Sequence, residues 1–493
     1  MRLLKHPASP WIILVVVALL WRVVYAYWTP ILEQYIVPPG DDAVFHITAI
    51  NNLMQGHLTL FSGTYPLGFH YIIAILATLL GISALQAVIW LTPALLVIPI
   101  LVIYFVGSRL FKSDAAGAIA SASWAFLALG PVRALGDGNY VNLLASSILL
   151  PLAVLSIYNA VQAPKLKRYL LAVLMVGLIA ITHHLTLVYL LVIIMPSLTL
   201  ILFEKIWSTR HSRQSWRTVF AIVGIAFAIL TLLYVFYRTM LGPYLSNLWQ
   251  GQSLAQAFGT DNKSLDLIKI LEINNAALIV LGLVGLIALM LSRSNRHLKL
   301  IMASWVLILI AISTAPYLAL QGRFARELAV PCALLVGFLG AAFVRLATRH
   351  KATAGAVFII VLVFSIDLLA SFSRPFTLPN PFSALMRVDH TEETAIKKLR
   401  TISNPSTIIL SANSNPFLPL LVDANIIVPP VAGDLVDILR QPIDIVYIGA
   451  RPALTEIYPY YQNYDEISQA LRAIPKLELV EQFANGSAIY RMK

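Results

Sequence analysis

The sequence predicts a polytopic α-helical membrane protein that carries a small α/β domain near its C-terminus. Only 12% of the 493 residues are charged, whereas soluble domains carry about 25% charged residues. Hydrophobic residues make up 59% of the chain, and runs such as residues 85–107 are long enough to cross a bilayer. The composition changes after Arg374, where proline and charged residues become frequent.

Apolar runs predict about eleven transmembrane helices within residues 1–372. We place them near residues 10–30, 85–107, 114–130, 140–162, 168–182, 185–204, 217–240, 274–292, 298–315, 328–347 and 352–372. The apolar run at 66–81 is shorter, because a helix of this length extends about 24 Å and a hydrocarbon core is about 30 Å thick. We therefore expect an interfacial or re-entrant helix there, within a first outer loop at residues 31–84.

The charges of the connections predict the orientation. If the N-terminus is cytoplasmic and residues 66–81 do not cross, most lysines and arginines of the connections lie inside and most acids outside. The positive-inside rule describes this pattern, and it accounts for the net charge of +12 without a nucleic-acid partner. The sequence thus predicts a multi-pass plasma-membrane protein, with all residues after 372 extracytoplasmic. Cys332 is the single cysteine, which excludes a disulfide and a cysteine metal site.

Residues 375–493 are predicted to form the extracytoplasmic α/β domain. A helix is expected to start near Thr391, where two acids follow and favour the helix N-terminus. The stretches TIILSAN, NIIVPP and DIVYIGA predict strands, YDEISQALRAI predicts a helix, and Asn485-Gly486 predicts a hairpin turn. No catalytic motif stands out in this domain.

The first outer loop contains the stretch GDDAVFH, with Asp41, Asp42 and His46. Asp42 and His46 are four residues apart and therefore share one face of a helix. One interpretation is structural: Asp41 caps the helix, and Asp42 favours its N-terminus and pairs with His46. The other is functional, because ionisable groups beside a membrane are costly unless they are used or paired.

Other polar side chains gather on the same predicted outer face. Guanidinium groups suit phosphate oxygens, so three arginines are candidates for binding a phosphate: Arg133, Arg323 and Arg326. The other polar residues of these loops are candidates for substrate binding: Asp137, Asn139, Tyr140, His183, His184 and Glu327. The alternatives are a solvated turn at 131–139, water-bound histidines at the interface, and a helical pair between Arg323 and Glu327.

Four stretches resemble the GT-C superfamily of membrane glycosyltransferases: GDDAVFH, TYPLGFHYIIAIL, GNYVNLLASSILLPL and GRFARELAVP. The resemblance covers roughly residues 1–372. It implies a hexosyl- or pentosyltransferase that moves a sugar from a polyprenyl-phosphate donor to a lipid, glycan or protein acceptor outside the membrane. It also implies a first-loop aspartate as general base or metal ligand, and adds His70 to the substrate-binding candidates.

The resemblance leaves two aspartates in competition for the role of base. The spacing to His46 favours Asp42, whereas the acid pair of the family, taken from its first member, favours Asp41. Whether Asp41 and Asp42 hold Mg²⁺ or Mn²⁺ is left open. The chemistry implied is an inverting displacement, in which a carboxylate takes the acceptor proton and arginines stabilise the departing phosphate.

Three rival functions use the same features differently. A ligase or polymerase of lipid-linked polysaccharide would share the outer-face site and the arginines without needing the acid pair. A transporter usually shows repeated halves and ionisable groups near mid-membrane, whereas here no repeat is visible and the polar groups gather on one face. A receptor or scaffold role for the outer domain is the third.

Overall fold

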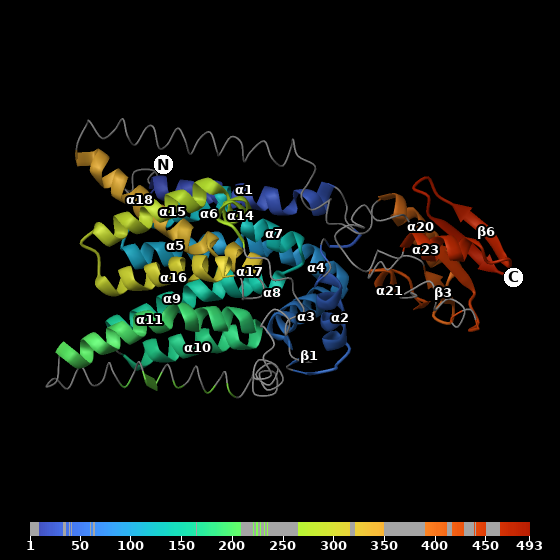
Figure 1. Ribbon diagram of the computed structural model, residues 1–493, viewed down its shortest axis with the longest axis horizontal. Helices are drawn as coiled ribbons and strands as arrows, with labels where there is room; N and C mark the ends of the chain where they lie inside the picture. The colour runs from blue at the N-terminus through green and yellow to red at the C-terminus, as the bar shows by residue number, and fades with distance from the viewer. Residues whose placement is uncertain are drawn as a thin grey trace. The chain divides into compact units, whose positions relative to one another are not determined.

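A computed structural model gives the structure of the protein (Figure 1). It describes residues 9–32, 36–38, 40, 42–59, 61–62, 65–163, 165–208, 265–315, 321–349, 390–411, 417–427, 440–449 and 464–493, with isolated positions between 220 and 234 and at 438. The chain divides into two compact units: Met1–Glu33 with His46–Pro381, and Gln34–Phe45 with Phe382–Lys493. The boundary predicted between residues 372 and 375 lies outside the described residues.

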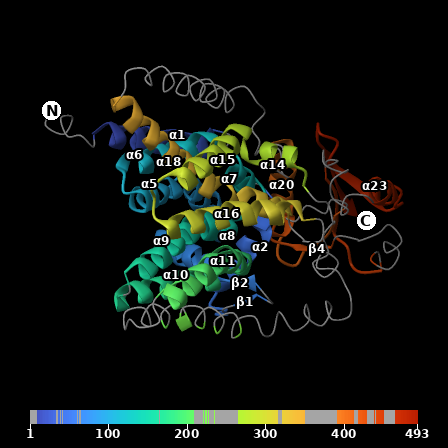
Figure 2. The same cartoon turned by 60° about the vertical axis from the view of Figure 1, so that its left-hand side comes forward.

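The first unit is a bundle of long apolar helices. Its main helices are α1 (Ser9–Leu32), α4 (Ala84–Leu91), α5 (Ile98–Phe111), α6 (Asp114–Leu127), α9 (Leu150–Gln162), α10 (Leu166–Thr182), α11 (His184–Ser208), α15 (Ala276–Leu291), α16 (Arg296–Thr314) and α18 (Ala329–Arg349). Helices α1, α6 and α18 lie on one side of the bundle and α10 and α11 on the other, as both views show (Figures 1 and 2).

The helix lengths make the chain a multi-pass membrane protein. Within the described residues, six helical stretches are long and apolar enough to span a bilayer, or up to eight if each bent pair is one span. The count of about eleven remains a prediction. Two of the predicted spans, 217–240 and 352–372, lie wholly or mostly outside the described residues, and the span predicted at 168–182 corresponds to α10, which has 17 residues.

The first loop starts and ends at the same end of the bundle. Tyr27, near the end of α1, donates to the carbonyl of Trp90, near the end of α4, and between these two helices α3 (Gly68–Leu80) has only 13 residues. It ends at Gly81, whose left-handed φ of 64° suits a residue without a side chain. A short antiparallel pair, β1 (Phe61–Ser62) and β2 (Tyr65–Pro66), precedes it. A short helix lies where it was predicted, and that it does not cross the membrane stays a prediction.

Glycines let the helices at the centre of the bundle approach closely. A side chain at Gly117 of α6 would meet the Tyr104 carbonyl of α5, and one at Gly337 of α18 would meet the Ala116 carbonyl of α6. Close packing of this kind stabilises helix pairs in a lipid environment, where apolar contact alone does not favour association.

Short helices gather toward one end of the bundle, which we call the polar end. They are α2 (Asp42–Met54), α3, α7 (Gly130–Gly136), α8 (Tyr140–Leu144), α14 (Leu267–Asn274) and α17 (Gln321–Glu327) (Figure 1). Two of them are bent continuations of spans: α7 leaves α6 at 49°, and α14 meets α15 at 106°. These breaks bring polar loop residues back over the ends of the helices.

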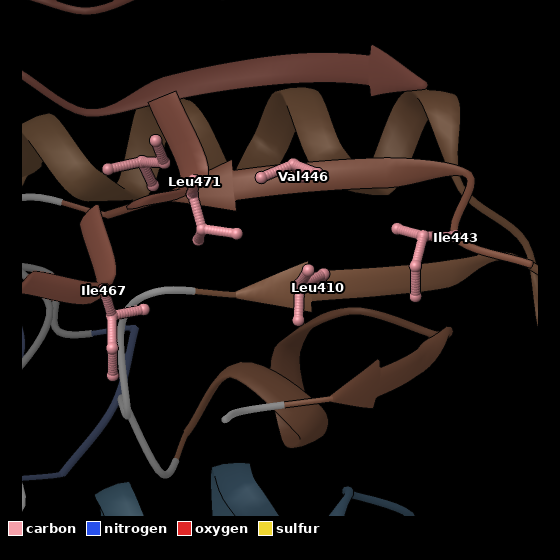
Figure 3. Packing of buried hydrophobic residues seen from close by; sticks show 6 residues of the cluster. Leu410, Ile443, Val446, Ile467 and Leu471 are labelled. Atoms are coloured by element: carbon pink, nitrogen blue, oxygen red, sulfur yellow. The ribbon is translucent and has the colours of Figure 1, made fainter. Parts of the chain in front are cut away.

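The second unit contains a five-stranded mixed sheet in the order β4-β3-β5-β7-β6. Parallel strands β3 (Ile408–Ser411), β4 (Asn425–Ile427) and β5 (Ile445–Ile448) precede the antiparallel hairpin of β6 (Leu477–Gln482) and β7 (Ala488–Met492), which turns at Gly486. The unit also contains α20 (His390–Ile402), α21 (Leu418–Leu421) and α23 (Tyr464–Arg472). Leu410, Val446 and Leu471 belong to its buried core (Figure 3).

Candidate functional site

A hydrogen-bonded histidine pair joins the first two helices of the polar end. The Nδ1 atom of His46, in α2, lies 2.8 Å from the Nε2 atom of His70, in α3. Both side chains are buried, with exposed fractions of 2% and 0%. Since one ring nitrogen must donate and the other accept, the contact fixes the relative position of α2 and α3.

Aromatic side chains surround this pair. The ring centroid of His46 lies 5.8 Å from that of Phe69 and 5.4 Å from that of Tyr140, and the two aromatic residues are almost fully buried. Phe69 belongs to α3 and Tyr140 to α8. The cluster therefore joins three stretches that are far apart in the sequence: GDDAVFH, PLGFH and GDGNY.

Burial determines the charge state of the pair. Burial lowers the pKa of His70 to about 3. Burial, and secondly the neighbouring His70, hold the pKa of His46 well below its ordinary value, although a hydrogen bond with the Gly138 backbone opposes the shift. Both histidines are consequently neutral near pH 7.

Local sequence explains how α3 reaches its position. A side chain on Gly68 would collide with the Ile181 carbonyl, so glycine permits the start of α3 to touch the end of α10. His183 follows α10 directly. Its Nδ1 atom is 2.8 Å from the Thr186 hydroxyl and accepts the Thr186 backbone N–H at 3.4 Å. His183 thus holds the start of α11, and His184 is the first residue of that helix.

An ion pair joins α7 and α17 at the polar end. Arg326 donates to the carboxylate of Asp137, and both side chains are partly exposed, by 20% and 33%. Arg133 interacts electrostatically with three charged neighbours: Arg326, Asp137 and Glu272. Two cations and two anions therefore lie near one another where the spans end, and of these the two guanidinium groups are the ones that can bind a phosphate.

A buried hydrogen bond joins α8 and α17. Asn142 donates through Nδ2 to Oε1 of Glu327 at 2.9 Å, and both residues are 4% exposed. The hydroxyl of Ser146 also hydrogen-bonds to Glu327. Ser146 lies in a π-helical turn, Ala145–Leu149, a feature that is frequent at functional sites.

Asn274 completes the junction of α7, α14 and α17. Its Nδ2 donates to the Ala325 carbonyl at 2.6 Å. A side chain on Gly130 would collide with Oδ1 of Asn274 and with the backbone of Arg326. The small residue therefore lets the three short helices meet, which places Arg326 against Asp137.

Of the remaining predicted site residues, some belong to the part of the chain that the structure describes and others do not. Asp42 is the first residue of α2 and is partly buried. Asn139 precedes α8 and makes no capping hydrogen bond through its side chain. Asp41 and the side chain of Arg323 lie outside the described residues. Among the residues that are described, no three or more of His, Cys, Asp and Glu form a group that fits a metal ion.

Several residues at the polar end were not predicted: Phe69, Asn142, Ser146, Glu272 and Asn274. The sequence offered one indication, since Asn142, Ser146 and Asn274 are polar residues in or beside apolar runs, where they are costly unless bonded. Phe69 offered none, because an aromatic residue in an apolar helix is indistinguishable from ordinary core.

Solved structures share this fold. An oligosaccharyltransferase from Archaeoglobus fulgidus matches 97% of this chain over 73% of its own, with a TM-score of 0.59 and 12% identity. ArnT from Cupriavidus metallidurans matches 98% of both chains, with a TM-score of 0.58 and 12% identity. The arabinofuranosyltransferase AftD from Mycobacteria matches 99% of this chain but only 40% of its own, with a TM-score of 0.53 and 16% identity. The fold is that of the GT-C glycosyltransferases.

The family of the chain is also defined. The chain belongs to DUF6541, a family of unknown function, whose model matches residues 2–326. That range contains every residue of the polar end named above except Glu327. No curated protein matches the sequence.

Proposed function

We propose that the protein is a membrane glycosyltransferase that moves a hexose or pentose from a polyprenyl-phosphate donor to a lipid, glycan or protein acceptor on the extracytoplasmic face. The GT-C fold over nearly the whole chain supports this proposal. Two of the similar enzymes were solved with lipid phosphates: the oligosaccharyltransferase with dolichol-phosphate and ArnT with undecaprenyl phosphate.

The observation that carries the proposal is the buried contact between His46 and His70. It anchors α2, the helix whose first residue is Asp42. Burying a polar contact costs the desolvation of both groups. An ordinary solvated loop has no use for such a contact, so its presence indicates that the position of α2 matters. We assign His46 and His70 to holding α2 and α3, since neither ring is exposed.

Asp42 is proposed as the general base, with Asp41 as the alternative. A carboxylate removes the proton from the acceptor hydroxyl as its oxygen attacks the anomeric carbon of the donor. The bond from that carbon to the lipid phosphate breaks, and the single displacement inverts the anomeric centre.

Arg326 and Arg133 are proposed to bind the donor phosphate, and Arg323 is a further candidate. Negative charge grows on the departing phosphate, so a guanidinium beside it stabilises the transition state more than the ground state. Asp137 holds Arg326 in place through their ion pair. Metal binding by Asp41 and Asp42 remains a separate prediction.

A substitution at the proposed base tests the function. D42N keeps the size of the side chain and removes its basicity, so transfer should fall about 100-fold or more. The matched control is D114N, because Asp114 is also the first residue of a helix, α6, and is exposed. The comparison is made by mass spectrometry of lipids and glycans from cells that contain the wild type, either variant, or no gene.

The outcomes separate the proposed transferase from its rivals. Loss of one glycoconjugate, with its lipid-linked sugar accumulating, in D42N cells but not in D114N cells supports the transferase. An unchanged product in both variants would remove Asp42 as the base, and D41N would then separate a transferase that uses Asp41 from a ligase or polymerase that needs neither acid. Identical glycans and lipids with and without the gene would contradict a transferase of any kind.

A further inference from the structure

The first span contains a buried arginine that the proposed mechanism does not use. Arg22 of α1 is 3% exposed, and a charged side chain inside a membrane span is costly unless it has partners. Among the described residues, none of its hydrogen bonds is to a carboxylate. Its partners are instead main-chain carbonyls of another helix.

Those carbonyls lie where α6 breaks. The Nη2 atom of Arg22 donates to the Trp124 carbonyl at 3.1 Å and to the Ala128 carbonyl at 3.0 Å. Ala128 is the residue after α6, with an extended backbone (φ −76°, ψ 102°). Pro131 in the first turn of α7 has no N–H, so it cannot continue the hydrogen-bond ladder of α6. The Trp124 carbonyl keeps its helical donor, the Ala128 N–H at 3.2 Å, so Arg22 adds a second donor there and replaces the missing one at the Ala128 carbonyl.

Aromatic groups fix the guanidinium at this position. Its central carbon lies 5.0 Å from the ring centroid of Trp124 and 5.4 Å from that of Tyr25, within the range of cation–π attraction. Trp21 of α1 also lies beside Phe126 of α6, with ring centroids 6.2 Å apart. The contact between α1 and α6 is thus built around the break.

The break between α6 and α7 sets the direction in which α7 runs at the polar end. From it, α7 departs at 49° and carries Arg133 and Asp137, and Asp137 pairs with Arg326 of α17. A straight continuation of α6 would point α7 elsewhere and separate these groups.

We propose that Arg22 is a positioning residue, which holds the α6–α7 bend by binding the Trp124 and Ala128 carbonyls and thereby keeps α7 against α17. The role of the bend in donor binding rests on the proposed function, whereas the position of α7 does not. The two can therefore fail separately.

Cross-linking tests the position of α7 without an activity assay. The background is C332A, which removes the single cysteine, with D137C and R326C introduced on α7 and α17. These two changes remove the ion pair, so a short bifunctional thiol reagent then reports the placement of the helices. We expect efficient cross-linking with Arg22 present, about threefold less in R22K, and at least tenfold less in R22Q.

A matched variant separates this effect from the general loss of a cation. Arg109, at the end of α5, also lies over an aromatic ring, 5.6 Å from the centroid of Phe105. R109Q should therefore leave the cross-linking yield unchanged. Wild-type yield in folded R22K or R22Q, or an equal loss in R109Q, would overturn the proposal. R22K that fails to fold would also overturn it, because Arg22 would then maintain the whole bundle.

Kinetics of R22K, with Asp137 and Arg326 intact, test the link to donor binding. A displaced α7 should raise KM for the lipid-linked sugar about tenfold and change kcat less. Reduced cross-linking with unchanged KM would keep the positioning role and contradict the assigned phosphate site. A merely structural role would lower the amount of folded protein and leave KM of the folded fraction unchanged.

Discussion

Two polar contacts at the same end of the bundle differ in charge and exposure. His46 and His70 form a neutral pair that is almost completely buried among aromatic rings. Asp137 and Arg326 form an ionic pair, with a fifth to a third of each side chain exposed. Both join helices from distant parts of the chain, α2 with α3 and α7 with α17.

The difference indicates a division of labour. A buried neutral pair has no surface to offer a substrate, but its hydrogen bond is strong in a medium of low dielectric. A partly exposed ion pair contributes little to stability, yet its arginine is accessible to an anion. We therefore expect changes at the histidines to affect folding, and changes at the ion pair to affect binding.

The largest effect is expected for R326Q, on binding of the donor. A hydrogen bond to a charged group contributes about 1.5–3 kcal/mol, so KM for a polyprenyl-phosphate sugar should rise ten- to a hundredfold. The melting temperature should change little. The control is R296Q, since Arg296, the first residue of α16, forms a more exposed pair with Glu204 near the end of α11. Equal KM changes in the two variants would remove the distinction between the ends.

A smaller free-energy change is expected for H70A, on folding. The substitution leaves a buried ring nitrogen of His46 without this hydrogen bond, and such a loss costs about 1–3 kcal/mol. The melting temperature in detergent should fall by several degrees, whereas H57A, at an exposed loop histidine, should not change it. A normal melting temperature for H70A would show that the pair does not anchor α3.

The smallest and most specific effect is a pH dependence of stability. In the folded state, burial lowers the pKa of both histidines from the ordinary value of 6.5. For His70 the pKa falls to about 3. Their contribution to stability is thus complete above pH 6.5 and is lost progressively as the pH falls, because the unfolded state binds the protons first. Each histidine adds at most about 1.4 kcal/mol per pH unit.

Melting curves between pH 7.5 and pH 5 check this slope. The H46Q/H70Q variant should lose less stability over this range than the wild type, and H57Q should match the wild type. A wild-type slope in the double variant would place the titrating groups elsewhere.

The sequence predicted the class of the fold because membrane spans depend on length and hydrophobicity, which are local properties. The apolar run at 66–81 was predicted not to cross for the same reason, and the helix there has 13 residues. The bends after α6 and before α15 were not predicted. Arg22 and Asn274 hydrogen-bond beside these bends to carbonyls from distant parts of the chain, and no local pattern reveals such contacts.

The candidate site was predicted only in its parts. The sequence identified Asp137 and Arg326 separately as polar residues at span ends, but their pairing depends on the junction at Gly130. The sequence predicted that His46 shares a helix face with Asp42, but it gave no sign of the hydrogen bond between His46 and His70 of α3. The partner of a buried polar group is a tertiary property, so spacing along one helix could not identify it.

The most direct test of the central claim is a cryo-EM structure of the full chain with undecaprenyl phosphate. The account predicts the lipid phosphate at the polar end, within hydrogen-bonding distance of the Arg326 guanidinium. A phosphate bound at the opposite end of the bundle, near Arg109 and Lys112, would contradict it, as would a saturated sample in which the polar end holds no lipid.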